Sequence, residues 1–166
     1  MRKKIVSALC ALALMFGLIW STGVDVEASD SVPMLDGSYL THETESIGHG
    51  VQITRGLNLQ EGYSKLVRRG AGVIYAGGTT IATHTVESVK VTVLVERARD
   101  ENDEWHFVDT WHKENTNADL VSTNKRMEVE GGWYYRVRCT HSADGDMSSS
   151  FTDGLYVSSP TSSSTP

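Results

Sequence analysis

The sequence predicts an all-β fold, an antiparallel β-sandwich of the immunoglobulin-like kind with seven or eight strands, preceded by a signal peptide. Three observations predict it. Apolar residues recur with a period of two rather than 3.6. Clusters of turn-forming residues interrupt the chain every ~8–12 residues. No segment has the apolar spacing of an amphipathic helix, and residues 50–157 are close in length to the ~100 residues of such a sandwich.

The N-terminus has the three parts of a secretory signal peptide. Residues 2–4 are basic, Ile5–Trp20 is almost wholly apolar, and Ala28 follows Val26 as in a small-residue cleavage site. The apolar run is shorter than the ~20 residues that span a bilayer. We therefore expect cleavage of residues 1–28 and a secreted, extracellular protein with no membrane contact afterwards. An uncleaved anchor is the alternative.

Composition divides the remaining chain into three parts. Residues 29–49 are polar and without period, which indicates a linker in which one short strand could fit. Residues 50–157 carry the alternating pattern and form the predicted β-sandwich domain. Residues 158–166 are only Ser, Thr and Pro. Such a tail cannot bury apolar surface, and we expect it to be disordered.

The clearest strand is the run of residues 89–95, in which valine occupies every second position. Strict alternation of β-branched residues is typical of a half-buried strand. Residues 100–103 are turn formers, and residues 105–112 then alternate again. Two alternating runs across a short polar loop predict a β-hairpin.

A third strand opens after Gly131-Gly132. Alternation places Trp133, Tyr135, Val137 and Cys139 on one face, and Tyr134, Arg136 and Arg138 on the other. Asp144-Gly145 predicts a turn, and residues 155–157 a last strand. Weaker strands fit residues 51–54, 73–76, 79–84 and 120–129, with Gly70, Gly72, Gly77 and Gly78 as turns or bulges between them.

Residues 135–139 and 142–145 carry a local resemblance. Tyr-Arg-Val-Arg-Cys followed by Ser-Ala-Asp-Gly resembles the next-to-last strand and turn of fibronectin type III domains. The resemblance implies that Tyr135 is the tyrosine-corner residue. The chain departs from that family in lacking a placeable tryptophan in an early strand.

The chain as a whole resembles an uncharacterised family of small secreted proteins from clostridial Gram-positive bacteria. This resemblance implies export and brings no activity with it. It rests on Arg55-Gly56, Gly70-Ala71-Gly72, Gly78-Thr79-Thr80, Val95-Glu96-Arg97, Trp105 and Gly131–Val137.

Charge and cysteine content exclude several classes of protein. The formal net charge is −6, and the longest basic run after residue 28 is Arg68-Arg69. A nucleic-acid partner, which needs clustered cations, is therefore not expected. Cys139 is the one cysteine beyond the signal peptide, so no intrachain disulfide can form. We expect it to be a small buried core residue, with an intermolecular bridge as the alternative.

No catalytic, metal-binding or cofactor-binding pattern is present. No serine lies in a G-x-S-x-G elbow. His106 and His112 share a strand face, but six residues at ~3.3 Å each keep them too far apart to share an ion. The acidic run of residues 100–104 lacks the glycine and glutamate of an EF-hand loop. We predict no catalytic residue, no metal and no cofactor.

Aromatic residues are the most suggestive feature. Sugar rings stack on exposed aromatic rings in many β-sandwich modules. Alternation places Trp133, Tyr135, Trp105 and Phe107 in the core. It leaves Trp111, near a strand end, and Tyr134 as the candidate ligand-binding residues. Asp109, between inward aromatics, needs a charged partner or an open strand end.

The leading functional hypothesis is a secreted, non-catalytic module that binds an extracellular protein or glycan. Two alternatives stay open. One is a secreted hydrolase whose residues meet only in space, and the other is a released structural or signalling protein.

Overall fold

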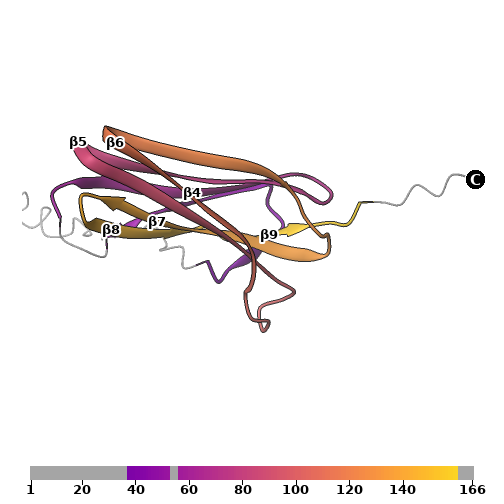
Figure 1. Ribbon diagram of the computed structural model, residues 1–166. Coiled ribbons are helices and arrows are strands. Elements are labelled where there is room, and N and C mark those ends of the chain that lie inside the picture. Colours follow the sequence, from indigo (N-terminus) through magenta and orange to yellow (C-terminus); the bar gives the residue numbers. More distant parts are fainter. Residues whose placement is uncertain (1–36, 53–55, 161–166) are drawn as a thin grey trace, which may run out of the picture. The chain divides into compact units, whose positions relative to one another are not determined.

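The computed structural model describes residues 37–52 and 56–160. These residues are all-β. No helix able to cross a membrane occurs in this part of the chain. The predicted signal peptide, residues 1–28, lies outside the described residues. The strands are β1 (Leu40–Thr41), β2 (Glu45–His49), β3 (Val51–Gln52), β4 (Leu59–Gly70), β5 (Val73–Ala98), β6 (His106–Glu128), β7 (Trp133–Ala143), β8 (Asp146–Phe151) and β9 (Gly154–Val157) (Figure 1).

The strands form one curled, mixed sheet in the order β1-β9-β7-β5-β4-β2. β6 pairs with β5 along most of its length, and β8 pairs with both β7 and β3. All pairs are antiparallel except β1 with β9, which is parallel. The all-β prediction is therefore confirmed, and the sheet is mixed rather than wholly antiparallel.

The long β5–β6 hairpin turns a corner in the middle. Ile81 pairs with Leu120 and Val86 pairs with Ala118, so β5 has more residues in this stretch than β6. Before the corner β5 pairs with β4, and after it with β7, so that one strand serves both parts of the curled sheet (Figure 1).

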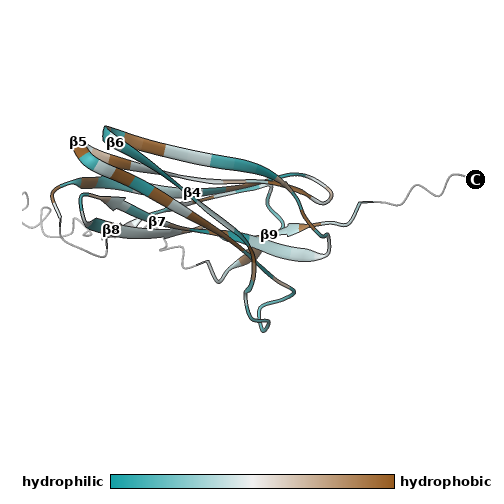
Figure 2. Cartoon of the chain, viewed as in Figure 1, coloured by the Kyte–Doolittle hydropathy of each residue, from teal (hydrophilic) through white to brown (hydrophobic). Residues whose placement is uncertain are grey.

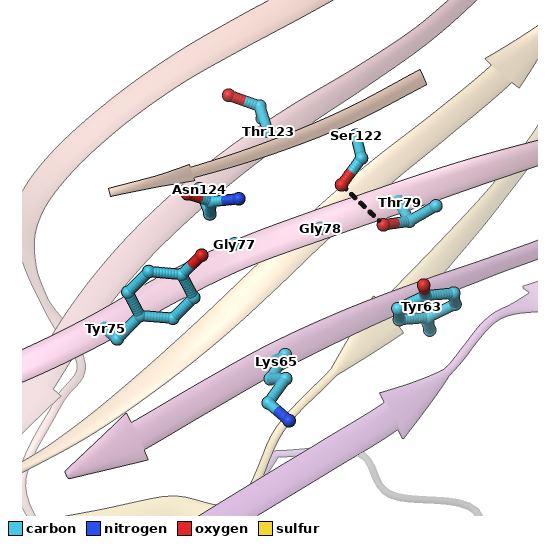
Figure 3. A pocket seen from close by; sticks show the side chains of 9 residues that line it. All are labelled: Tyr63, Lys65, Tyr75, Gly77, Gly78, Thr79, Ser122, Thr123 and Asn124. Carbon is cyan, nitrogen blue, oxygen red and sulfur yellow. Dashed lines mark hydrogen bonds between the residues drawn. The ribbon is translucent and has the colours of Figure 1, made fainter. Parts of the chain in front are cut away.

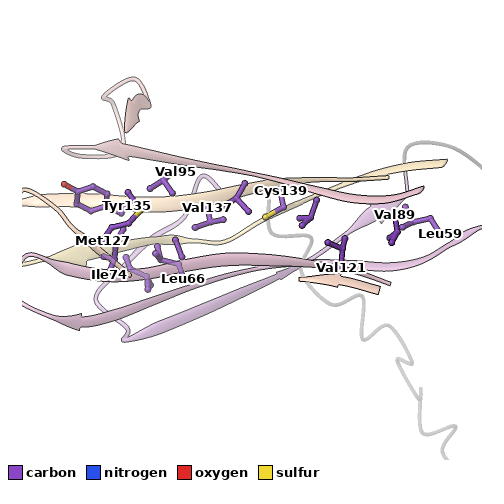
Figure 4. Close-up of a cluster of buried hydrophobic side chains, with 14 of the residues drawn as sticks. Leu59, Leu66, Ile74, Val89, Val95, Val121, Met127, Tyr135, Val137 and Cys139 are labelled. Carbon is purple, nitrogen blue, oxygen red and sulfur yellow. The ribbon is translucent and has the colours of Figure 1, made fainter. Parts of the chain in front are cut away.

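The apolar core lies inside the curl, between β4 and the first part of β5 on one side and the second part of β5 with β7 on the other (Figure 4). The four predicted alternating valines, Val89, Val91, Val93 and Val95, are all fully buried. Figure 2 shows the corresponding alternation of hydrophobic and hydrophilic residues along β5. Burying one such side chain contributes about 1.5–3 kcal/mol, so this strand is a main source of stability.

Several predicted turns are confirmed. Arg97 pairs with His106 across the acidic turn, which makes the β5–β6 hairpin. β7 begins at Trp133, directly after the two glycines. Asp144, with φ of 44°, and Gly145, with φ of 89°, make the turn between β7 and β8. Both residues adopt the left-handed conformation that such tight turns require.

The sequence did not predict β4 or β8, because small or polar residues occupy inward positions in both strands and interrupt the apolar alternation. In β4 the buried residues include Gly62 and Ser64, and in β8 they are Ser148 and Ser150. A Cβ on Gly62 would lie 2.3 Å from Cγ of His141. The glycine is thus required by a neighbouring ring, and together with Ser64 it interrupts the apolar alternation between the buried Leu59 and Leu66.

The prediction of a turn or bulge at Gly77-Gly78 is wrong, since both residues lie within β5 and pair with β4 and β6 without a register shift. A Cβ on Gly78 would lie 2.5 Å from Sγ of Cys139, and one on Gly77 would lie 2.6 Å from the carbonyl oxygen of Thr123. These glycines therefore mark close approach of neighbouring groups rather than a change of chain direction.

The ends of the sheet differ from the predicted domain limits. β1 and β2 lie within the segment expected as a linker, and β2 pairs with β4. At the other end, the Gly72 amide donates to the carbonyl of Ser158 at 2.9 Å. Residues 158–160 of the predicted tail therefore contact the sheet, and residues 161–166 lie outside the described residues.

Candidate functional site

A hollow of about 160 Å³ opens on the outer face of the sheet, above the glycine pair of β5 (Figure 3). β4, β5 and β6 all contribute to it. Its lining residues are Tyr63, Lys65, Tyr75, Gly77, Gly78, Thr79, Ser122, Thr123 and Asn124.

The strand register explains why the hollow lies at this place. Lys65, Gly77 and Asn124 form one row across the three strands. In the next row Thr79 lies between Tyr63 and Ser122. Because Gly77 has no side chain, the centre of the first row is empty. The backbone of β5 becomes the floor, and the neighbouring side chains form the walls.

Two tyrosines stand at opposite ends of the hollow, with Lys65 between them (Figure 3). Tyr63 pairs with Thr79 of β5, and Thr79 is four residues from Tyr75 along that strand. At ~3.3 Å per residue, this offset separates the two positions by about 13 Å along the strand. Both rings are half-buried, so each has its base held by the sheet and part of its surface open.

The polar groups of the hollow are hydrogen-bonding groups rather than a catalytic set. The Lys65 ammonium lies 2.8 Å from a carboxylate oxygen of Glu45. The Thr79 hydroxyl donates to Ser122 Oγ at 2.9 Å. Asn124 adds an amide. The residues that line this hollow include no histidine, cysteine or carboxylate. The arrangement can hold a ligand with many hydroxyls, and it offers no nucleophile–base pair.

A second hollow, of about 430 Å³, continues the first along β4. It is lined by Glu45, Lys65, Val67, Arg69 and Tyr75 and shares Lys65 and Tyr75 with the first. The two hollows thus form one groove, here called the Gly77 groove, which runs from Tyr63 past Gly77 and Tyr75 to Arg69.

Trp111, the first residue predicted to bind ligand, lies outside this groove. It pairs with Val93 and packs against the core, half-buried. The Lys125 ammonium lies 5.6 Å from the centre of its ring. Its indole Nε1 is buried and has no hydrogen-bond partner among the described residues. The ring is therefore largely covered by its own chain.

Tyr134, the second predicted residue, belongs to a small aromatic cluster. Its ring lies 5.2 Å from that of Tyr156, and its hydroxyl is 3.3 Å from Nε2 of His42. Alternation along β7 directs Tyr134 away from the core, whereas Trp111 is on the core side of β6. The structure therefore does not bring Trp111 and Tyr134 together into one site.

The core positions predicted for the other aromatic residues are confirmed only in part. Trp133 and Tyr135 are buried, as predicted, and the guanidinium groups of Arg97 and Arg99 lie 4.2 and 4.3 Å from the ring centre of Trp133. Trp105 is half-buried beneath Arg136, whose guanidinium lies 4.0 Å from its ring centre.

Phe107 is 66 % exposed, so its predicted core position is wrong. The register shifts where Val95 pairs with Asp109 but Glu96 pairs with Phe107. Such a bulge reverses the alternation of side chains between its two sides, so Phe107 does not share the face of Asp109. Asp109 has the charged partner that its position demands, because its carboxylate lies 2.5 Å from Nζ of Lys125.

The chain also has a buried polar row that sequence reasoning missed. His141 is fully buried, with Nδ1 2.8 Å from Oγ1 of Thr80 and Nε2 2.8 Å from Oγ of Ser150. The Thr80 hydroxyl lies 3.0 Å from the carbonyl of Lys90, to which it donates. The neutral ring therefore donates from Nδ1 to Thr80 and accepts at Nε2 from Ser150.

Burial fixes the protonation of this row. It lowers the pKa of His141 from 6.5 to about 4, and it raises the pKa of the neighbouring Cys139 thiol to about 12. Both groups are neutral near pH 7, and Cys139 is the buried core residue that was predicted. A histidine beside a serine is a nucleophile–base pairing in hydrolases. Here the ring and Ser150 are both fully buried, so no substrate reaches them.

Within residues 37–52 and 56–160, no three His, Cys, Asp or Glu side chains gather as metal ligands would. No protein-family model matches the chain. A search of curated proteins likewise finds no match.

Proposed function

We propose that the chain is an exported, non-catalytic module that binds an extracellular glycan in the Gly77 groove. One observation carries the proposal. Two tyrosine rings stand on either side of a glycine floor, and ammonium, hydroxyl and amide groups lie between them.

This arrangement matches the surface of a sugar. The apolar C–H face of a pyranose packs on an aromatic ring, and the rigid ring holds its place at little entropic cost. The sugar hydroxyls need polar partners at the edge, which Lys65, Thr79 and Asn124 supply. The ~13 Å offset between the two tyrosines along the strand favours a short oligosaccharide that contacts both rings.

Export and the finer fold assignment belong to the same proposal. Export is supported by the basic, apolar and small-residue pattern of residues 1–28. An immunoglobulin-like plan is supported by the Tyr135 hydroxyl, which donates to the carbonyl of Glu130 at 2.7 Å. That bond, from a tyrosine near a strand start to the backbone just upstream, is the tyrosine-corner arrangement of such domains.

The test is a glycan array followed by calorimetry on residues 29–166. Tyr63→Ala and Tyr75→Ala should each weaken binding about tenfold, which is what loss of one stacked ring corresponds to. Tyr39→Ala is the matched control, because Tyr39 is 67 % exposed and lies outside the groove.

Trp111→Ala and Tyr134→Ala test the two earlier candidates in the same assay. We expect both to bind glycan as the unaltered chain does. If both groove variants retained full affinity while Tyr134→Ala lost it, the site would lie at the His42–Tyr134–Tyr156 cluster instead. Binding of a protein, and of no glycan, would replace the proposed ligand class.

A further inference from the structure

We infer that the Gly77 groove selects an acidic saccharide, whose carboxylate-bearing sugar stacks on Tyr75. This inference rests on the proposed function and specifies its ligand class. The observation behind it is the distribution of charge along the groove, which differs between the two tyrosine ends.

Two cationic side chains line the groove beside Tyr75, and a third belongs to its cross-strand partner on β6. Lys65 and Arg69 lie on β4 and line the same hollow as the ring. The Arg69 guanidinium lies 6.0 Å from the ring centre. Arg126 occupies the position directly opposite Tyr75 on β6. A sugar stacked on this ring would have Lys65 and Arg69 beside it on β4, and Arg126 on the neighbouring strand β6.

Carboxylates only partly balance these charges. Glu45 pairs with Lys65 at 2.8 Å, and Glu128 contacts Arg126 at the longer distance of 3.5 Å. Among the described residues, Arg69 has the contact with Tyr75 and no carboxylate partner. The Tyr75 end therefore has an excess of positive charge, although the chain as a whole has a net charge of −6.

The guanidinium of Arg69 is suited to a carboxylate. Its planar fork can donate hydrogen bonds to both carboxylate oxygens at once, which fixes the orientation of the bound group in addition to the attraction between the charges. A sugar carboxylate there would also compete with Glu45 for Lys65. The exposed Lys65–Glu45 pair is of a kind that contributes little stability, so its rearrangement costs little.

The Tyr63 end lacks this excess. His49 lies against Tyr63, with ring centres 6.4 Å apart, and its Nδ1 is 2.9 Å from a carboxylate oxygen of Glu61. The other polar partners at this end, Thr79 and Ser122, are neutral and bond to each other. The acidic sugar unit therefore belongs at the Tyr75 end, and a neutral unit fits the Tyr63 end.

The experiment compares uronic acid oligosaccharides with their methyl esters, which keep the sugar rings and remove the charge. Galacturonate, glucuronate and mannuronate oligomers are titrated into residues 29–166 by calorimetry at low and high salt. We expect the acid form to bind about tenfold more tightly at low salt. The preference should shrink as salt screens the charges.

Arg69→Gln should abolish the preference for the acid and leave binding of the ester unchanged. Tyr75→Ala should weaken both forms. Lys90→Gln, which removes a β5 lysine outside the groove, is the matched charge control and should change neither.

The outcomes separate the two proposals. If acid and ester bind equally, or if only neutral glycans bind in the Gly77 groove, the acidic inference is overturned and the glycan function stands. If Arg69→Gln keeps the full preference, Arg69 is not the selecting group and the inference also fails. If no glycan of either kind binds, the proposed function itself is overturned.

Discussion

The buried imidazole of His141 makes the stability of the fold depend on pH. Burial holds its pKa at about 4 in the folded chain, against 6.5 when exposed. Between these values the unfolded chain binds a proton that the folded chain does not. The contribution of the neutral His141 to the free energy of unfolding is therefore fully present above pH 6.5. It is lost as the pH falls from 6.5 towards 4.

The size of the effect follows from the same two values. At ~1.4 kcal/mol for each pKa unit, full protonation of the unfolded chain costs the fold about 3 kcal/mol. A domain of this kind has a free energy of unfolding of about 5–15 kcal/mol, so this loss is a large fraction of it. Hydrogen bonds with the Arg99 amide and with Lys125 lower the pKa values of Asp103 and Asp109, respectively, from 3.8. The contributions of these carboxylates to the free energy of unfolding are therefore lost only below pH 4. The window from pH 6.5 to 5 thus reports on histidine.

The assay is urea denaturation followed by tryptophan fluorescence at pH 8, 7, 6 and 5. The free energy of unfolding of the unaltered chain should fall by about 2 kcal/mol between pH 7 and 5. His141→Gln should show a much flatter profile, and His84→Gln, which alters an exposed ring, should keep the slope of the unaltered chain.

Because His141→Gln could fail to fold, a second measurement is needed. NMR of the unaltered chain should show a His141 ring that stays neutral down to pH 5. An imidazole that titrates near 6.5 in the folded chain would refute the reasoning.

Two further predictions concern the neighbourhood of Cys139. Gly78→Ala should lower the free energy of unfolding by about 1–3 kcal/mol, because the added Cβ would lie 2.5 Å from Sγ of Cys139. The Gly78→Ala, Cys139→Ala double variant should recover part of that loss in urea titrations, and no recovery would mean that another contact causes it. The Cys139 thiol, with its pKa raised to about 12 by burial, should be inert to a thiol reagent in the folded chain and react on addition of denaturant. Rapid labelling of the folded chain would contradict the burial of this side chain.

Strands with a β-branched or aromatic inward face could be predicted from the sequence, and the others could not. The valines of β5 and the Trp133–Cys139 alternation of β7 carry their own signal, because apolar burial is what holds them. The inward positions of β4 are set by its neighbours. Gly62 is small because His141 occupies the space beside it, and a single sequence does not show that contact.

The candidate site was missed for a related reason. Reading Gly77-Gly78 as a turn ended the strand and discarded the alternation that links Tyr75, Gly77 and Thr79. Continued through the glycines, the period of two would have placed all three on one outer face. Trp111 was predicted to be exposed because it lies near a strand end, and Tyr134 because alternation directs it outward. Only the packing shows Lys125 against Trp111 and Tyr156 against Tyr134.

The two adjacent glycines also decide how the site can be tested. Gly78 faces inward and leaves room for Cys139, while Gly77 faces outward and forms the floor of the groove. Alternation gives each residue a separate role, yet a Cβ at either position meets an atom within 2.6 Å. Any larger residue at Gly77 would therefore disturb β6 as well as fill the groove, and lost binding would not distinguish the two effects. Truncating Tyr63 or Tyr75 removes a half-exposed ring and leaves the glycine pair and the core intact. A loss of glycan binding in those variants, with unfolding free energy unchanged, would locate the ligand rather than report a damaged fold.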